Sequence, residues 1–224
     1  MIRMPIAAVA ASIALAACGG RSYGVAPSVP TGVAPGSQTR QAQGAARADA
    51  AHAEFVYVAN SGSNNISAYA INESSGALTQ VKGSPFRARS SPSGVAVDSR
   101  GKFAYVSNED SDNISAYAIN ESSGALTQVK GSPFRARSSP GGLAVDPTGK
   151  FAYVVNPLSD NVSAYAINAS SGALTQVKGS PFRAGRSPVA MAVDPTGKFA
   201  YVSNPAFNNV SACRIESSGA LTPV

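Results

Sequence analysis

Short apolar runs separated by polar turns recur along this chain at a constant interval. A run with phenylalanine, tyrosine and valine, closed by asparagine, returns every 48 residues. Its four copies are residues 55–60, 103–108, 151–156 and 199–204. Residues 65–92 are identical to residues 113–140. A repeat of this length is typical of a protein that stacks copies of one supersecondary unit.

One period contains four apolar segments of strand length. In residues 141–177 we predict strands at 142–145, 151–155, 162–167 and 173–177. The third strand alternates, with Val162, Ala164 and Ala166 on one face and Ser163, Tyr165 and Ile167 on the other. Proline, glycine and asparagine mark tight turns between the strands and interrupt every window long enough for a helix. The pattern predicts an all-β fold, a β-propeller whose blades are four-stranded units of 48 residues.

Several repeated motifs resemble those of a known group. Tyr-Val-x-Asn, Val-Asp-Pro-Thr-Gly-Lys, Ser-Gly-Ala-Leu-Thr and Gly-Ser-Pro-Phe are similar to the motifs of YVTN-type propellers in the lactonase-like family. The resemblance covers residues 55–224. It implies the propeller fold and, as an activity, hydrolysis of sugar lactones of the 6-phosphogluconolactone type. Because these are turn and strand residues, they indicate a fold more than a chemistry.

The repeats are too few for the ring that the resemblance implies. Such propellers usually have seven blades, whereas residues 55–224 hold about three and a half repeats. We predict three strands in 55–81, full blades at 93–129, 141–177 and 189–223, and a poor strand near 45–49. An open ring leaves two apolar faces in water. Two chains could complete one ring as a homodimer, the sheets could close into a smaller form, or the chain could be a truncated fragment; we expect an incomplete ring in the monomer.

The first residues are typical of an exported lipoprotein. Arg3 precedes an apolar stretch from Ile6 to Leu15, and small residues then lead to Cys18. The tetrapeptide at 15–18 resembles a bacterial lipobox, which implies acylation of Cys18 and, with Gly19 following, sorting to the outer membrane. We therefore predict a signal peptide at 1–17, a flexible tether at 18–50 rich in Gly, Pro, Ala and Ser, and the partial propeller at 51–224.

Candidate catalytic and metal-binding residues are few. His52, the single histidine, lies where tether and domain join, and has no repeated counterpart. Three acids at 109–112 could suit Ca²⁺, but aspartate and asparagine are ordinary turn residues. The Asn-x-Ser triplets are interpreted as turns at strand starts. Cys213 occupies a slot that holds tyrosine in the other repeats, so we expect it to pack in the core without a disulfide. The sequence assigns no catalytic residue, metal or cofactor.

Charge is unevenly divided between the two sets of loops. In a propeller, the loops between second and third strands share an end with those that join one blade to the next, and basic residues outnumber acids there. The arginines at this end are Arg87, Arg89, Arg135, Arg137, Arg183 and Arg186. Arginine suits carboxylate and phosphate ligands, so these residues are candidates for binding an anionic partner.

Two interpretations remain open at this point. The first is a non-enzymatic binding or scaffold module, anchored in the bacterial envelope, that recognises an anionic polysaccharide or a protein. Nucleic acid is excluded because no aromatic stacking platform accompanies the arginines. The alternative is the lactone hydrolase that the resemblance implies. The missing catalytic set favours the first.

Overall fold

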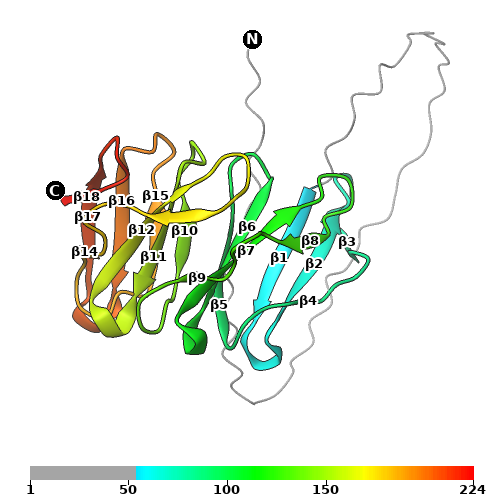
Figure 1. Ribbon diagram of the computed structural model, residues 1–224, viewed down its shortest axis with the longest axis horizontal. Coiled ribbons are helices and arrows are strands. Elements are labelled where there is room, and N and C mark those ends of the chain that lie inside the picture. Colours follow the sequence, from blue (N-terminus) through cyan, green and yellow to red (C-terminus); the bar gives the residue numbers. More distant parts are fainter. Residues whose placement is uncertain (1–53) are drawn as a thin grey trace, which may run out of the picture. The chain divides into compact units, whose positions relative to one another are not determined.

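The structure is a computed structural model, and it describes residues 54–224. These residues form four antiparallel sheets (Figure 1). The first sheet contains β1 (Glu54–Asn60), β2 (Asn65–Ile71), β3 (Leu78–Gln80) and β4 (Phe86–Arg87). The second contains β5 (Pro92–Val97), β6 (Phe103–Asn108), β7 (Asn113–Ile119), β8 (Leu126–Gln128) and β9 (Phe134–Arg135).

The third sheet repeats the second, and the fourth repeats its first four strands. The third contains β10 (Leu143–Val145), β11 (Phe151–Asn156), β12 (Asn161–Ile167), β13 (Leu174–Gln176) and β14 (Phe182–Arg183). The fourth contains β15 (Ala190–Val193), β16 (Phe199–Asn204), β17 (Asn209–Ile215) and β18 (Leu221–Pro223). A short 3-10 helix joins β1 to β2 in the first sheet and the second strand to the third in each of the others: η1 (Ser61–Ser63), η2 (Glu109–Ser111), η3 (Pro157–Ser159) and η4 (Pro205–Phe207).

The turns follow from the side chains that the repeats preserve. Asp146 Oδ1 accepts hydrogen bonds from the amides of Lys150 and Phe151, and Gly149 takes a φ of +68° that closes the turn. At the other end of the sheets, Asn108 Nδ2 donates to Asn113 Oδ1 at 2.9 Å and so ties the end of β6 to the start of β7. The final asparagine of the Tyr-Val-x-Asn motif therefore positions a 3-10 turn. The Asn-x-Ser triplets begin β2, β7, β12 and β17, which confirms their interpretation as strand starts.

The outer edge of the first three sheets is longer than the sequence predicted. We expected fifteen strands, whereas residues 54–224 contain β1 to β18, because β4, β9 and β14 add a second pairing along the strand that follows the 3-10 helix (β2, β7 and β12). The Gly-Ser-Pro segment kinks the chain after β8, and Ser132 Oγ accepts the Ala116 amide at 2.9 Å in place of a backbone carbonyl. Phe134–Arg135 then pairs with the start of β7. The Ser132 side chain thus supplies the hydrogen bond that the backbone lacks between β8 and β9, where the sequence pattern predicted the end of the outer strand.

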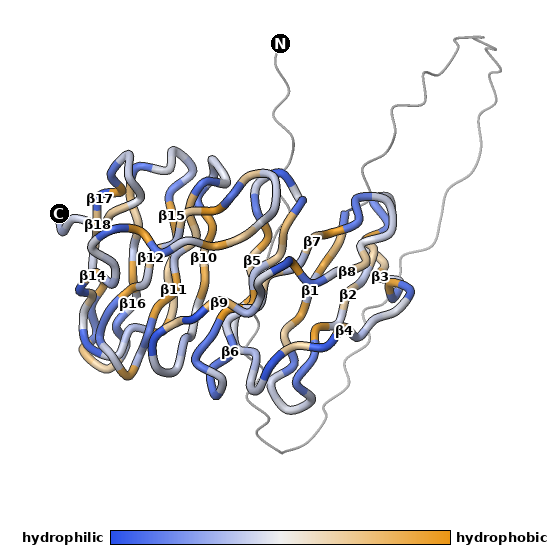
Figure 2. Tube along the Cα trace, in the orientation of Figure 1, coloured by the Kyte–Doolittle hydropathy of each residue, from blue (hydrophilic) through white to orange (hydrophobic). Residues whose placement is uncertain are grey.

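The core lies between the sheets as three separate clusters. Tyr57, Ile66 and Ala68 of the first sheet pack against Val106 and other residues of the second. Equivalent residues join the second sheet to the third and the third to the fourth. Figure 2 shows apolar residues along the strands and hydrophilic residues in the loops at both ends of the sheets. The small alanines at the sheet centres let neighbouring sheets approach closely, as in propeller blades.

A repeated hydrogen bond joins each sheet to the next. The hydroxyl of Tyr57 donates to the carbonyl of Gly124 at 2.9 Å, and Tyr105 and Tyr153 make the same bond to Gly172 and Gly219. Within residues 54–224 no core cluster joins the fourth sheet to the first. The sheets therefore do not close, which confirms the expected incomplete ring.

Several predictions concern residues outside the described part. The signal peptide, Cys18, the tether, the weak strand at 45–49 and His52 all precede residue 54. Within residues 54–224, no helix is long and apolar enough to span a bilayer. Cys213 is buried in the cluster between the third and fourth sheets, as expected for a residue in a tyrosine slot, and burial raises the pKa of its thiol.

Candidate functional site

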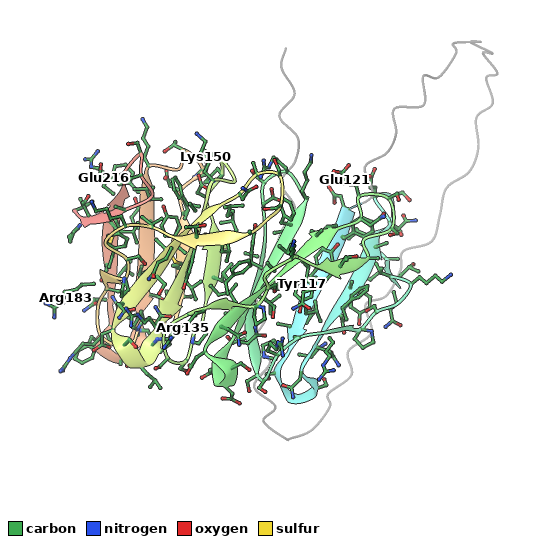
Figure 3. All side chains as sticks on the ribbon, viewed as in Figure 1. Tyr117, Glu121, Arg135, Lys150, Arg183 and Glu216 are labelled. Atoms are coloured by element: carbon green, nitrogen blue, oxygen red, sulfur yellow. The ribbon has the colours of Figure 1, made fainter. Side chains whose placement is uncertain are left out.

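The arginine-rich segments lie against the 3-10 helices, at the end of the sheets that the sequence predicted. Arg87 pairs with Asn65 in the β4–β2 ladder, and the Arg89 amide donates to Asn108 Oδ1 of the next sheet at 3.3 Å. We call the segments that join one sheet to the next crossovers: the first contains Arg87, the second Arg135 and the third Arg183. The first crossover is thus attached to both sheets that it joins. Figure 3 shows Arg135 and Arg183 towards this end, whereas Lys150, Glu121 and Glu216 lie at the opposite end.

A cavity lies where the segment that joins the second sheet to the third meets the third sheet. Its volume is about 440 Å³. We call it the Arg135 pocket, and its lining residues are Asp112, Arg135, Ala136, Arg137, Ser138, Tyr165 and Gln176. Two arginines, an aspartate, a tyrosine and a glutamine therefore line one cavity.

A smaller copy of this cavity lies one repeat earlier. The Arg87 pocket has a volume of about 240 Å³ and is lined by Arg87, Ala88, Arg89, Ser115, Tyr117 and Gln128. The position of Asp112 is taken by Asn64 in the first sheet. The sequence repeat thus produces two similar arginine-lined cavities, and a carboxylate distinguishes the larger one.

Buried tyrosines hold both crossovers in place. The hydroxyl of Tyr165 donates to the Arg135 carbonyl at 2.9 Å, and Tyr117 donates to the Arg87 carbonyl at 2.8 Å. Desolvation raises the pKa of the Tyr165 phenol, against opposing effects of a hydrogen bond with Ser163 and the charge of Arg137. The phenol therefore stays protonated and keeps its role as a donor to the crossover.

Asp112 is oriented by its own backbone and by the neighbouring crossover. It adopts a left-handed conformation, with φ of 51°, at the end of η2. Its Oδ1 accepts the amide of Ser139 at 2.8 Å. The carboxylate of Glu109 accepts the hydroxyl of the same serine at 2.9 Å. The acidic turn at 109–112 thus fixes the crossover, and residues 54–224 contain no group of three or more potential metal ligands.

The arginines of the two pockets have no carboxylate partner at salt-bridge distance among residues 54–224. Within the described residues the ion pair that forms is Arg100 with Asp98, at 2.9 Å and at the other end of the sheets. The guanidinium groups of Arg135 and Arg137 are exposed. They are therefore available to an anionic ligand, for which a planar guanidinium offers paired donors.

The structure separates the six candidate arginines into groups. Arg135 and Arg137 share the larger pocket, and Arg87 and Arg89 share the smaller one. Arg183 and Arg186 line neither, and the Arg186 guanidinium lies 5.5 Å from the centre of the Phe207 ring. In the segment that joins the third sheet to the fourth, Gly185 stands where the preceding repeat has Arg137, and an added Cβ there would lie 2.3 Å from Asn204.

Sequence reasoning missed three residues of the larger pocket. Asp112, Tyr165 and Gln176 come from different turns and strands, and only the stacking of two sheets brings them together. One signal was present for Tyr165, since the repeat places tyrosine at 69, 117 and 165. The 48-residue spacing explains Cys213, but it does not by itself show that Tyr165 contacts Arg135, because that contact joins two repeats.

The sequence matches the model of a protein family described as a lactonase with a seven-bladed β-propeller. The match comprises two segments, residues 27–133 and 130–224, and so includes all the described sheets. The chain belongs to this family. The resemblance drawn from the turn and strand motifs is therefore confirmed. A comparison with curated proteins gives no match.

Solved structures place the lactonase-family chain among propellers of known shape. A candidate 6-phosphogluconolactonase of Bacteroides uniformis shares 20% identity over 72% of this chain and 47% of its own, with a TM-score of 0.64. A second, of Bacteroides fragilis, shares 21% over 80% and 56%, with a TM-score of 0.64. The periplasmic gluconolactonase PpgL of Pseudomonas aeruginosa shares 20% over 76% and 50%, with a TM-score of 0.65. The chain spans about half the length of these structures, and at this identity the likeness establishes the fold.

Proposed function

We propose that this chain contributes to hydrolysis of a sugar lactone, and that the Arg135 pocket holds the anionic group of that substrate. The observation that carries the proposal is the family match across all four sheets, together with neighbours described as a gluconolactonase and as candidate 6-phosphogluconolactonases. A phosphorylated lactone carries a group that two exposed guanidiniums bind well. This departs from the sequence-based preference for a non-enzymatic module.

The chemistry needs an activated water molecule and a donor for the oxyanion that forms at the lactone carbonyl. In the Arg135 pocket, Asp112 supplies the base, because the Ser139 amide holds Oδ1 and leaves Oδ2 to accept a proton from water. One guanidinium neutralises the phosphate or carboxylate of the substrate. The other lies in the same cavity, where it can stabilise the negative charge of the tetrahedral intermediate.

The test is hydrolysis of paired phosphorylated and neutral sugar lactones by the full chain and by two variants. Asp112→Asn should lower kcat about 100-fold or more while leaving the fold intact. Asn64, the counterpart in the first sheet, shows that the turn accepts this residue: it has φ of 54° and holds the Ser91 amide at the same 2.8 Å.

Arg135→Ala should raise KM for the phosphorylated lactone and leave the neutral lactone nearly unchanged. Lys150→Ala, at the opposite end of the sheets, removes the same charge and serves as the control (Figure 3). Absence of hydrolysis by the full chain, or full activity of Asp112→Asn, would overturn the proposal.

A second candidate function is favoured by the repetition of the pocket. Two arginine-lined cavities one repeat apart suit a polymer that carries an anionic group on each unit, such as an acidic polysaccharide of the bacterial envelope. An envelope anchor at Cys18 would hold the chain beside such a polymer. In this case, the paired variants Arg87→Ala/Arg89→Ala and Arg135→Ala/Arg137→Ala should each weaken binding to an acidic polysaccharide, with no lactone turnover. Binding by both variants that equals wild-type binding would exclude this function.

A further inference from the structure

We propose that the open face of the fourth sheet packs on the open face of the first sheet of a second copy of this chain, head to tail. Neighbouring sheets pack through one repeated set of contacts, which we call a joint, and the four described sheets form three such joints. The first sheet and the fourth sheet each carry one half of a further joint. The proposal concerns this contact and goes beyond the proposed activity.

Each internal joint contains the same aromatic and glycine contact. In the joint between the first and second sheets, the Phe55 ring lies over the turn at Gly124, where an added Cβ would come within 2.3 Å of the ring. Tyr57 donates to the carbonyl of the same glycine. The next two joints repeat this with Phe103 over Gly172 and Phe151 over Gly219. A joint therefore needs a phenylalanine and tyrosine on one sheet and a bare glycine turn on the next.

The fourth sheet presents the aromatic half without a partner. Tyr201 is 45% exposed, whereas its counterpart Tyr153 is 0% exposed. Val210 is 63% exposed, whereas its counterpart Val162 is 1% exposed. These residues face the side on which each earlier sheet receives its successor, so this apolar face has the composition of a sheet interface.

The first sheet presents the glycine half without a partner. Gly76 occupies the same turn as Gly124, with φ of +69° against +70°, yet no atom of residues 54–224 lies within 4 Å of its added Cβ. Leu78, which follows this turn, is 53% exposed, whereas Leu126 is 8% exposed. Because residues 65–92 are identical to residues 113–140, the turn at Gly76 has the same sequence as the one that receives Phe55 and Tyr57.

Charge adds a second complementarity that the internal joints lack. Arg214 stands where earlier repeats have alanine, and its guanidinium lies 5.4 Å from the centre of the Phe199 ring. Phe199 is the counterpart of the phenylalanines that cover a glycine turn. The turn of the first sheet that would meet it carries Glu73 three residues before Gly76. Docking thus brings Arg214 of one copy beside a carboxylate of the other.

Two-fold symmetry allows two such joints in one pair of chains, since each copy offers both halves. The four described sheets of two copies make eight, one more than the seven in the family description. The repeated sequence determines the contacts of each joint. A slightly smaller angle between neighbouring sheets would allow eight sheets in the ring in place of seven. The second copy is favoured over an unrelated partner because its free face already has the sequence of an internal joint.

The experiment compares the association of the full chain with two single glycine variants by sedimentation velocity over a range of concentrations. Gly76→Ala places a methyl group where the partner's Phe199 must lie, and should weaken association at least about tenfold. Gly101→Ala introduces the same strain at φ of +68°, with no described atom within 4 Å, and should associate as the wild type does. A wild-type chain that stays monomeric throughout, or an unaltered Gly76→Ala variant, overturns the proposal.

A charge exchange gives an independent measurement. Arg214→Glu and Glu73→Arg should each weaken association, and the chain with both changes should regain it, because the joint again pairs opposite charges. Failure of the double variant to recover would argue against the head-to-tail contact. Circular dichroism of each variant checks that the sheets are retained.

Discussion

Replacing Gly172 by alanine should separate the strength of one sheet-to-sheet joint from the cost of backbone strain. Gly172 has φ of +71°, and its added Cβ would lie 2.4 Å from Phe103 Cδ1 and 2.6 Å from Cε1. The ring cannot move aside, since Phe103 is buried in the cluster between the second and third sheets. The carbonyl of the same glycine accepts the Tyr105 hydroxyl at 3.1 Å, so a shift of the turn also lengthens this bond.

The expected loss has two parts. An alanine held in the left-handed region costs about 1–2 kcal/mol. Forcing an extra methyl group into a packed joint costs about 1–3 kcal/mol more. The free energy of unfolding of Gly172→Ala should therefore fall by about 2–5 kcal/mol.

Gly76→Ala is the matched control, because its turn differs only in having Glu73 in place of Ala169, its φ is +69°, and no described atom lies within 4 Å of the added Cβ. In dilute solution, where chains do not associate, it should lose only about 1–2 kcal/mol. Urea unfolding of both variants at the same concentration measures the difference, read from the midpoint at constant m. Equal losses in the two variants would refute the reasoning, since the joint would then contribute nothing.

Three further predictions follow from the shifted pKa values of two tyrosines and one aspartate and from the predicted lipid anchor at Cys18. Desolvation raises the pKa values of Tyr105 and Tyr153, so the folded state keeps these phenols neutral. Their contribution to stability should be constant below about pH 10 and fall above it, where the unfolded chain ionises, and Tyr153→Phe should reduce that slope in urea unfolding at alkaline pH. The pKa of Asp194 is lowered, chiefly by the hydroxyl of Thr196, so the ionised carboxylate stabilises the folded state at neutral pH and this contribution is lost as pH falls through the lowered pKa. Asp194→Asn should therefore flatten the acid limb of the plot of unfolding free energy against pH, and an unchanged limb would contradict this. If Cys18 carries the anchor, Cys18→Ala should move the chain from the membrane fraction to the soluble fraction, whereas Cys213→Ala should not.

The blades could be predicted from the sequence because their signals are local. The turn at Asp146 closes through its own side chain and a glycine three residues later, and the strand at 162–167 alternates as its two faces require. Tyr165 and Ala164 indeed pack in different clusters, on opposite sides of the third sheet. Such features need no knowledge of distant residues.

The site could be predicted only in part, because it depends on contacts between repeats. The charge of the crossovers placed Arg135 and Arg137 at the correct end of the sheets. The pocket itself required Tyr165 and Gln176 of the following sheet, and the carboxylate of Asp112 looked like an ordinary turn residue. The outer strands were missed for a related reason, since Ser132 Oγ substitutes for a backbone acceptor and restarts the pairing after a kink.

Two identical repeats, one with and one without a preceding sheet, allow the free energy of forming a further joint to be assessed. Leu78 and Leu126 have the same neighbours in sequence, so the difference in their exposure measures the presence or absence of a preceding sheet. Burying a leucine contributes about 1.5–3 kcal/mol, and the joint would also cover Tyr201 and Val210. One joint must offset the lost freedom of two chains, which costs about 4–15 kcal/mol. A closed pair forms two joints against a single such cost, so it should be more stable than an open row of copies; a mass distribution that runs past the dimer with rising concentration would show that closure is not reached.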